Sequence, residues 1–184
     1  KWLNSTLNIY FNYTPTDAQG ISMCRLYGNW TGSFAVNQTN TSLANATSNF
    51  FTANLTAYAD GNYLWNVECN DTSNNIAFAQ SNFTVKFDTA IPQINYTSST
   101  DTDGANLSRN WIFVNVSVAE TNEANITFTL YNSTSSYNET TFTTAVRSIN
   151  WTGLAEGTYF FNVSIIDSAN TKNATATRIV RIDV

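Results

Sequence analysis

Residues 61–71 read GNYLWNVECND and residues 157–167 read GTYFFNVSIID, so one stretch occurs twice at an offset of 96 residues. In the first copy, large apolar residues fall on every second position, which is the period of a strand with one buried face. These apolar residues are Tyr63, Trp65, Val67 and Cys69. The polar face between them consists of Asn62, Asn66, Glu68 and Asn70. A central strand that is repeated at domain spacing predicts two copies of one β domain.

The length of the chain suits this interpretation. Its 184 residues allow one or two domains, and the repeat favours two domains of about 90 residues, the size of a small β-sandwich. We predict domain boundaries at 1–88 and 89–184, with residues 88–92 as the linker. Since no segment shows convincing helical periodicity, the predicted fold class is all-β, with two tandem β-sandwich domains.

The remaining strands are predicted from the same alternation of apolar and polar residues. In domain 1 the predicted strands are 7–13, 21–27, 50–57 and 76–87, the last one with a bulge. The range 28–48 is predicted as a long loop or weak edge strands, and 70–75 as a polar turn. Domain 2 begins with Ile94 and Tyr96 after Pro92, followed by a polar turn at 97–106. Its other predicted strands are 111–118, 125–131, 141–151 and 175–184.

The composition excludes several functional classes. Only 11% of the residues are charged, against about 25% in ordinary soluble domains, so the polar surface comes from 27 Asn, 28 Thr and 17 Ser. A net charge of −5 argues against nucleic acid and anionic membrane surfaces as partners. No apolar run approaches the roughly 18 residues of a membrane span. The chain begins without Met and shows no signal peptide, so we expect a processed chain or a piece of a longer one.

Asn-x-Ser/Thr sequons, in which x is not Pro, are far more frequent than expected. Eighteen of the 27 Asn residues carry one, where chance would produce roughly six or seven. The predicted glycosylation sites are Asn4, Asn12, Asn29, Asn37, Asn40, Asn45, Asn54, Asn70, Asn82, Asn95, Asn106, Asn115, Asn125, Asn132, Asn138, Asn150, Asn162 and Asn173. The alternative is that Asn and Thr simply suit exposed strands and turns.

The phase of these asparagines separates the two interpretations, because a glycan cannot point into a core. Asn12 lies opposite in phase to Ile9 and Phe11, and Asn82 lies opposite to Phe83 and Val85. Every sequon that can be placed on a predicted strand has this outward phase. We therefore predict heavy N-glycosylation and an extracellular or cell-surface location.

Domain 1 is shorter than domain 2 at its beginning. Alignment of Ile9 with Val114 places Lys1 opposite Asn106, so domain 1 has no counterpart of residues 92–100, its first strand. A sheet that is short of a strand has an open edge that can pair with another chain. We expect neighbouring copies to dock end to end as a homopolymer, by strand complementation at this edge. The alternative is that the strand was lost where the segment was cut.

The two cysteines, Cys24 and Cys69, lie in the core phase of strands that would be neighbours in one sheet. An extracellular setting favours a disulfide bond between them, and the alternative is two buried free thiols. In the repeat they correspond to Phe128 and Ile165, so both positions become apolar together. On the chain-entropy model, the cross-link would contribute about 4 kcal/mol.

These motifs resemble a known family. The pattern Gly-x-Tyr-x-Trp/Phe-x-Val-x-x-x-Asp, followed by Asp-Thr-Ala-Ile-Pro-x-Ile at 88–94, resembles the immunoglobulin-like repeats of archaeal and bacterial surface proteins. The cysteine arrangement is similar to the version found in archaeal envelope proteins. The resemblance covers nearly the whole chain. It implies immunoglobulin-like β-sandwiches in stalks, adhesins, surface layers or filaments, and it implies no particular ligand.

The residues that enzymes and metal sites need are scarce. The chain has no His, no Gly-rich phosphate loop and 13 scattered carboxylates, so we predict no enzymatic activity, no cofactor and no metal site. A pair of carboxylates of the glycosidase kind stays open as an alternative. Residues 101–104 are similar to the start of a calcium loop, but its twelfth position is Ile112 instead of Glu. Asp88 could join a calcium site at the linker, although a solvated turn or cap is the simpler interpretation.

Two tryptophans are predicted to be exposed and able to stack on a sugar or a neighbouring subunit, namely Trp30 and Trp111. The other large aromatics are assigned to the cores. The overall expectation is a non-enzymatic, glycosylated structural protein, a subunit or segment of a surface filament or cell-envelope fibre. The alternatives are an adhesin or stalk segment that binds a cell-surface or carbohydrate partner, and a carbohydrate-active module.

Overall fold

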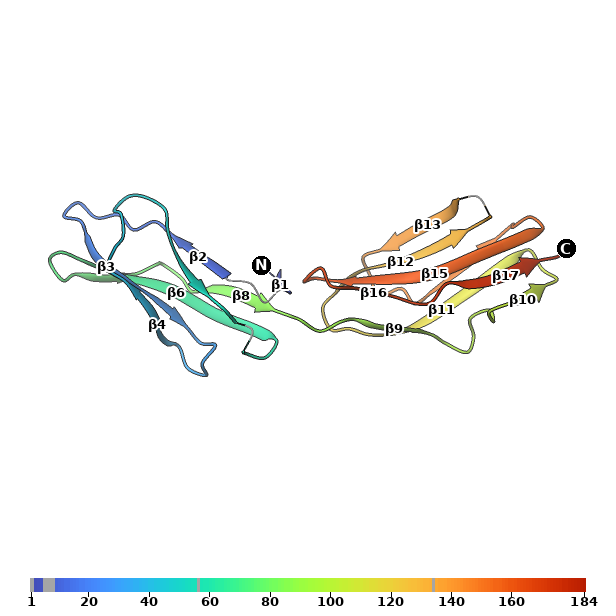
Figure 1. Ribbon diagram of the computed structural model, residues 1–184, viewed down its shortest axis with the longest axis horizontal. Coiled ribbons are helices and arrows are strands. Elements are labelled where there is room, and N and C mark those ends of the chain that lie inside the picture. The colour runs from blue at the N-terminus through green and yellow to red at the C-terminus, as the bar shows by residue number, and fades with distance from the viewer. Residues whose placement is uncertain (1, 5–8, 56, 134) are drawn as a thin grey trace. The chain divides into compact units, whose positions relative to one another are not determined.

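The computed structural model describes residues 2–4, 9–55, 57–133 and 135–184, and Leu7 of the predicted first strand lies outside them. The described residues form 17 β-strands and no helix, in two compact units, Lys1–Thr89 and Ala90–Val184 (Figure 1). This confirms the all-β prediction with two tandem sandwiches. Consequently, the described part of the chain contains no apolar helix that could cross a membrane.

Unit 1 (Lys1–Thr89) consists of two sheets. Its strands are β1 (Trp2–Leu3), β2 (Ile9–Tyr13), β3 (Ile21–Gly28), β4 (Ala35–Asn40), β5 (Asn49–Ala53), β6 (Gly61–Asp71), β7 (Ile76–Phe78) and β8 (Phe83–Phe87). The larger sheet has the order β1-β8-β6-β3-β4, with β7 also paired to β6. The smaller sheet contains only the antiparallel pair β2–β5 among the described residues.

Unit 2 (Ala90–Val184) repeats this arrangement with one additional strand. Its strands are β9 (Gln93–Tyr96), β10 (Ala105–Leu107), β11 (Trp111–Ala119), β12 (Glu123–Tyr131), β13 (Ser136–Phe142), β14 (Ser148–Thr152), β15 (Gly157–Asp167), β16 (Lys172–Ala174) and β17 (Arg178–Ile182). The larger sheet has the order β10-β17-β15-β12-β13, with β16 paired to β15. The smaller sheet is β14-β11-β9, and β9 runs beside β11 in Figure 1.

The registers show which strands correspond. Strands β1 to β8 match β10 to β17 one for one: β1 pairs in parallel with β8 and β10 with β17, and β3 pairs with β6 as β12 pairs with β15. Strand β9 is the exception, because the described residues of unit 1 include no strand in its place. That domain 1 lacks its own first strand was predicted from the alignment and stays a prediction.

Both central strands end in the same turn, which explains why the repeated stretch finishes with Asp. The Asp71 carboxylate accepts hydrogen bonds from the backbone N–H groups of Ser73 (2.7 Å) and Asn75 (2.9 Å). Asn74 has a φ of 67°, in the left-handed region that Asn tolerates better than most residues. In unit 2 the Asp167 carboxylate accepts from the N–H of Thr171 at 2.7 Å, so the turn is built in the same way.

The cores differ in how well they are closed. In β15 the alternating residues Tyr159, Phe161, Val163 and Ile165 are all buried, as the period-2 pattern predicts. In β6 only Val67 of the corresponding apolar set is buried, whereas Tyr63, Trp65 and Cys69 are half-buried. The apolar side of the central strand in unit 1 is therefore incompletely covered.

Several predicted boundaries were wrong. The range 76–87 forms two strands, β7 and β8, which both pair with β6. The range 141–151 is divided between β13 and β14, which belong to different sheets, because the chain crosses from one layer to the other at this point. The predicted polar turn at 97–106 ends in β10. For the range 28–48 the second predicted alternative, weak edge strands, is confirmed by the edge strand β4.

Candidate functional site

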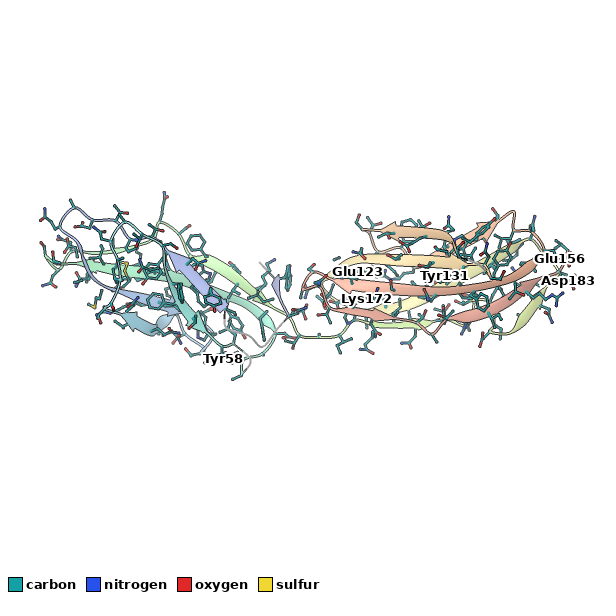
Figure 2. All side chains as sticks on the ribbon, turned by 45° about the horizontal axis from the view of Figure 1, so that its top comes forward. Tyr58, Glu123, Tyr131, Glu156, Lys172 and Asp183 are labelled. Atoms are coloured by element: carbon teal, nitrogen blue, oxygen red, sulfur yellow. A yellow bond between two sulfur atoms is a disulfide. The ribbon has the colours of Figure 1, made fainter. Side chains whose placement is uncertain are left out.

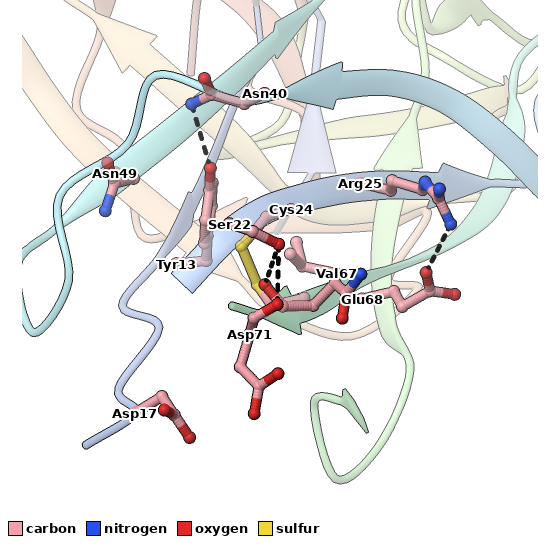
Figure 3. The surroundings of a disulfide bond; sticks show 12 residues. Tyr13, Asp17, Ser22, Cys24, Arg25, Asn40, Asn49, Val67, Glu68 and Asp71 are labelled. Atoms are coloured by element: carbon pink, nitrogen blue, oxygen red, sulfur yellow. Dashed lines mark hydrogen bonds and ion pairs between the residues drawn. A yellow bond between two sulfur atoms is a disulfide. The ribbon is translucent and has the colours of Figure 1, made fainter. Parts of the chain in front are cut away.

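The two cysteines form a disulfide bond across the central pair of strands in unit 1. Cys24 in β3 lies directly opposite Cys69 in β6, and their sulfur atoms are 2.00 Å apart (Figure 3). The corresponding pair in unit 2 is Ile126 opposite Ile165, and both residues are fully buried. The predicted counterpart Phe128 was therefore wrong, because the register aligns Phe128 with Leu26, two residues along the strand.

The C-terminal half of the opposite face of β6 is polar but not open to water, contrary to the alternation-based prediction, whereas Asn62 in its first half is exposed. Asn66, Glu68 and Asn70 are all buried. The Glu68 carboxylate accepts hydrogen bonds from the Arg25 guanidinium at 3.0 Å (Figure 3) and from the Tyr27 hydroxyl at 2.8 Å. The hydrogen bond to Glu68 raises the pKa of the Tyr27 phenol above its ordinary value of 10.0, with burial as a further cause. A polar network thus covers this face.

Ten sequon asparagines are exposed in the structure: Asn4, Asn12, Asn37, Asn45, Asn54, Asn82, Asn95, Asn106, Asn138 and Asn150. Seven more are half-buried, namely Asn29, Asn40, Asn115, Asn125, Asn132, Asn162 and Asn173. Several of the latter donate hydrogen bonds; for example, the Asn173 Nδ2 donates to the Pro92 carbonyl at 2.8 Å. Since a glycan replaces one of the two amide hydrogens, a single such bond is compatible with modification.

Asn70 does not have the orientation that a glycan requires. Its side chain is buried, its Nδ2 donates to the Asn74 Oδ1 at 3.3 Å, and its buried Oδ1 accepts no hydrogen bond. The sequence placed Asn70 at the beginning of a polar turn, whereas β6 continues through it to Asp71. The glycan at Asn70 does not fit this fold, and modification of the other sequons stays a prediction.

The two singled-out tryptophans differ in exposure. The prediction was wrong for Trp30, which is buried and stacks on Phe11 with ring centroids 5.6 Å apart. Gly28 was the sequence feature that could have indicated the burial of Trp30, because a Cβ at position 28 would lie 2.0 Å from a carbon of the Trp30 ring. Trp111 is exposed as predicted, and the Arg109 guanidinium lies 3.5 Å from its ring centroid. A cation–π contact of this kind leaves the other face of the indole open.

A groove of about 470 Å³ opens in unit 1 beside the end of β2. We call it the β6 groove, because its floor is the apolar side of β6, formed by Trp65, Val67 and Cys69. Tyr13 at the end of β2 and Phe83 of β8 also line it. Burial raises the pKa of the Tyr13 phenol above its ordinary value, while a hydrogen bond from Asn40 opposes this shift. The groove is thus a mainly apolar channel along one strand.

In unit 2 the corresponding space is filled by β9. Ile94 of β9 is buried, and the Tyr96 ring packs on Phe161 with centroids 5.7 Å apart. The Tyr96 hydroxyl donates to the carbonyls of Phe161 (3.2 Å) and Ala176 (2.9 Å). Because Phe161 corresponds to Trp65 of the groove floor, β9 occupies in unit 2 the position that is open in unit 1.

The carboxylates of the described residues do not assemble into a metal-binding cluster. No group of three or more His, Cys, Asp or Glu side chains among them could hold a metal ion. In unit 2, Glu123 lies at one end of the sandwich and Glu156 and Asp183 at the other (Figure 2). Asp101 is engaged by protein donors, since it pairs with Arg109 and accepts the Phe113 N–H at 2.9 Å. Asp88 at the linker is buried, so the predicted solvated turn was wrong, and a calcium site there stays the untested alternative.

Comparison with known proteins supports the fold. No protein-family model matches the sequence, and no curated protein matches it significantly. Among solved structures, the chain is similar to the fibronectin(III)-like modules of Clostridium thermocellum CbhA, with a TM-score of 0.52 and 13% identity, over 100% of this chain and 88% of that chain. It also matches a tetra-tandem repeat in the extending region of a large adhesion protein, with a TM-score of 0.42 and 15% identity, over 96% and 50% of the two chains.

A third match, to the central fibronectin-III array of RIM-binding protein, has a TM-score of 0.34 and 11% identity, over 97% of this chain and 65% of that chain. At these identities the similarity shows the fold alone, a tandem pair of sandwiches of the fibronectin III or immunoglobulin-like kind. The archaeal origin suggested by the sequence motifs stays a prediction.

Proposed function

We propose that this chain is a non-enzymatic, N-glycosylated segment of an extracellular fibre or stalk. The observation that carries the proposal is the placement of the sequon asparagines. All of them except Asn70 are exposed or half-buried on the outside of the two sandwiches. A sequence that merely favoured Asn and Thr on its surface would have no reason to place a Ser or Thr two residues after so many of them.

The disulfide bond and the surface chemistry support the same location. A disulfide between Cys24 and Cys69 persists in oxidising compartments and is rare in the cytosol. The charged fraction of 11% is low, and covalently attached saccharide would supply the hydration that charged side chains supply in other proteins. In this role the two cores provide rigidity, the outer faces carry sugar, and further copies of the chain extend the fibre in series.

The proposal is tested by mass spectrometry of the chain isolated from its native source. We expect intact masses above that of the polypeptide, and glycopeptides that map to exposed sequons such as Asn12, Asn82 and Asn138. Asn70 and the non-sequon Asn62 are internal controls that should carry no glycan. An intact mass equal to that of the bare polypeptide would reject the glycoprotein. Electron micrographs of native material that show only separate particles would reject the fibre.

An adhesin is the second candidate, and one surface feature favours it. Tyr10 of β2 and Phe50 of β5 are 61% and 57% exposed, and their rings are in edge contact at a centroid distance of 5.4 Å. Exposed aromatic pairs of this kind often mark contact sites for sugars or proteins. An adhesin should lose binding to cells or glycan arrays when Tyr10→Ser and Phe50→Ser are combined. Equal binding by wild type and variant would leave this pair without a recognition role.

A further inference from the structure

We propose that the β6 groove of unit 1 binds an extended peptide strand that carries an aliphatic residue and, two positions later, an aromatic residue. The strand would complete the two-stranded β2–β5 sheet, as β9 completes the corresponding sheet of unit 2. The inference concerns the partner of unit 1 and does not depend on glycosylation. It is based on unit 2 of this chain, in which β9 fills the corresponding site.

The groove floor shows what the occupant must bury. In unit 2, the floor residues Phe161, Val163 and Ile165 are fully buried under β9 and its neighbours. Their counterparts in unit 1 keep the same apolar character, but Trp65 and Cys69 are half-buried. Apolar surface left in water is unfavourable in proportion to its area, so covering this floor favours binding of an apolar side chain.

The strand edge defines the direction of the occupant. Strand β9 runs antiparallel to β11, with Tyr96 opposite Val116 and Ile94 opposite Val118. The positions in unit 1 that correspond to Val116 and Val118 are Phe11 and Tyr13 of β2, since Ile9 pairs with Ala53 as Val114 pairs with Ile149. The incoming strand therefore runs antiparallel to β2, with its aromatic residue opposite Phe11 and its aliphatic residue opposite Tyr13. Addition of a strand to an open edge is a recurrent mode of peptide recognition.

The rim of the groove distinguishes the open copy from the filled one. Phe83 of β8 lines the groove, is 49% exposed and stacks on Trp65 of the floor with ring centroids 4.8 Å apart. At the corresponding position unit 2 has Arg178. Phe78 also lines the groove, but it pairs with Glu68, so its side chain lies on the other face of the sheet. An exposed apolar ring beside an apolar floor favours an interaction site, and a peptide laid in the groove would contact Phe83.

A second copy of the chain is a less suitable occupant. Its own strand with the required pattern is β9, which is already paired with β11 and packed on Phe161. Donation of β9 to another molecule would open in unit 2 the same groove that it filled in unit 1, with no net gain in buried surface. The occupant is therefore an extended segment other than β9 that has the chemistry of β9.

The test uses the whole 184-residue chain and a labelled peptide with the sequence of residues 90–99, AIPQINYTSS. We expect saturable one-to-one binding by fluorescence anisotropy, with NMR shifts confined to β2, β6, β7 and β8. A matched peptide with the changes corresponding to Ile94→Asp and Tyr96→Asp should bind at least about tenfold more weakly. The rim variant Phe83→Ser removes the exposed ring that stacks on Trp65, and it should also bind more weakly. Val36→Ser, at an exposed position of β4 away from the groove, is the control that should bind normally.

Three results would overturn the inference. The first is no peptide binding up to about 1 mM, and the second is equal binding of the peptide with two Asp residues. The third is sedimentation of the chain alone as oligomers that the rim variant abolishes, which would assign the groove to a second copy. None of these results alters the glycopeptide map, so failure of this inference and failure of the proposed glycoprotein are separate outcomes.

Discussion

Unit 1 has a disulfide bond where unit 2 has Ile126 facing Ile165, and unit 2 has strand β9 where unit 1 has an open groove. The other eight strands correspond one for one. A small domain that buries less apolar surface has less stabilisation to offset chain entropy. The cross-link is thus found in the unit with the less complete core. Among the described residues, the cross-link and the open groove thus occur in the same unit.

The outer faces of the central strands differ in a second way. In unit 1, Arg25 is paired with Glu68 across β3 and β6. At the same positions in unit 2, Thr127 lies opposite Ser164. Unit 1 thus uses a charged network on a face that unit 2 builds from neutral hydroxyl groups. The two units therefore serve as internal controls for each other in the experiments below.

Reduction of the disulfide should produce the largest change in the relative stability of the two units. Cys24 and Cys69 are separated by 45 residues, and on the chain-entropy model the cross-link contributes about 4 kcal/mol to the free energy of unfolding. Calorimetry with a reductant should lower the transition of unit 1 and leave that of unit 2 in place. The variant Cys24→Ile/Cys69→Ile, which copies unit 2, should recover part of the loss. Equal shifts of both transitions would contradict the assignment.

Truncation of the strand that fills unit 2 should have the next largest effect. Ile94→Ala removes a buried side chain of β9 and should cost unit 2 about 2–3 kcal/mol, at the lower end for such changes because the site lies at a sheet edge. Unit 1 should be unaffected. Ile91→Ala is the matched control, since Ile91 is 58% exposed. A cost for Ile94→Ala no larger than that for Ile91→Ala would mean that β9 does not contribute to closing the core.

Disruption of the network of Arg25, Tyr27 and Glu68 should lower the free energy of unfolding of unit 1 by a smaller amount. It should also change the titration of Tyr27, which ultraviolet absorbance can follow. Glu68→Ser should cost about 1 kcal/mol, and addition of Arg25→Thr, which completes the unit 2 pair, should recover most of it. The Tyr27–Glu68 hydrogen bond raises the pKa of Tyr27, so its contribution is full below the ordinary tyrosine pKa and is lost as pH rises through the raised value. Ultraviolet titration should show a lower pKa for Tyr27 in Glu68→Ser. An unchanged titration curve would contradict the role of Glu68.

The turn aspartate should show the smallest effect, visible as a pH dependence. Hydrogen bonds from Asn75, and then from Ser73, hold the pKa of Asp71 below its ordinary value of 3.8. The stabilisation is therefore present above that ordinary value and is lost as pH falls through the lowered one. Asp71→Asn should lower the melting temperature of unit 1 at pH 7 and match wild type near pH 2. Asp183→Asn, at an exposed position, should match wild type at both pH values.

Much of the fold could be predicted because alternation is a local property. The repeated central strand, the facing cysteines and the outward phase of sequons such as Asn12 and Asn82 each follow from residues one or two positions apart. The errors have a common cause. Trp30 and Asn70 were assigned to exposed loops or turns, yet Trp30 folds back over Gly28 onto Phe11, and Asn70 lies within an extended β6. The local alternation pattern predicts which face of a strand a side chain lies on. It does not predict whether another part of the chain covers that side chain.

The sequence by itself determined that the protein has two β domains of one kind, that Cys24 and Cys69 share a face, and that residues 1–88 contain no stretch that aligns with residues 92–100. Only the tertiary structure showed how this difference between the two domains affects the burial of their central strands. It showed that Trp65, Val67 and Cys69 form the floor of an open groove, and that Ile94 and Tyr96 cover the corresponding floor in unit 2. The physical reason is that side-chain phase along a strand assigns a residue to a face, whereas burial depends on which distant strand covers that face.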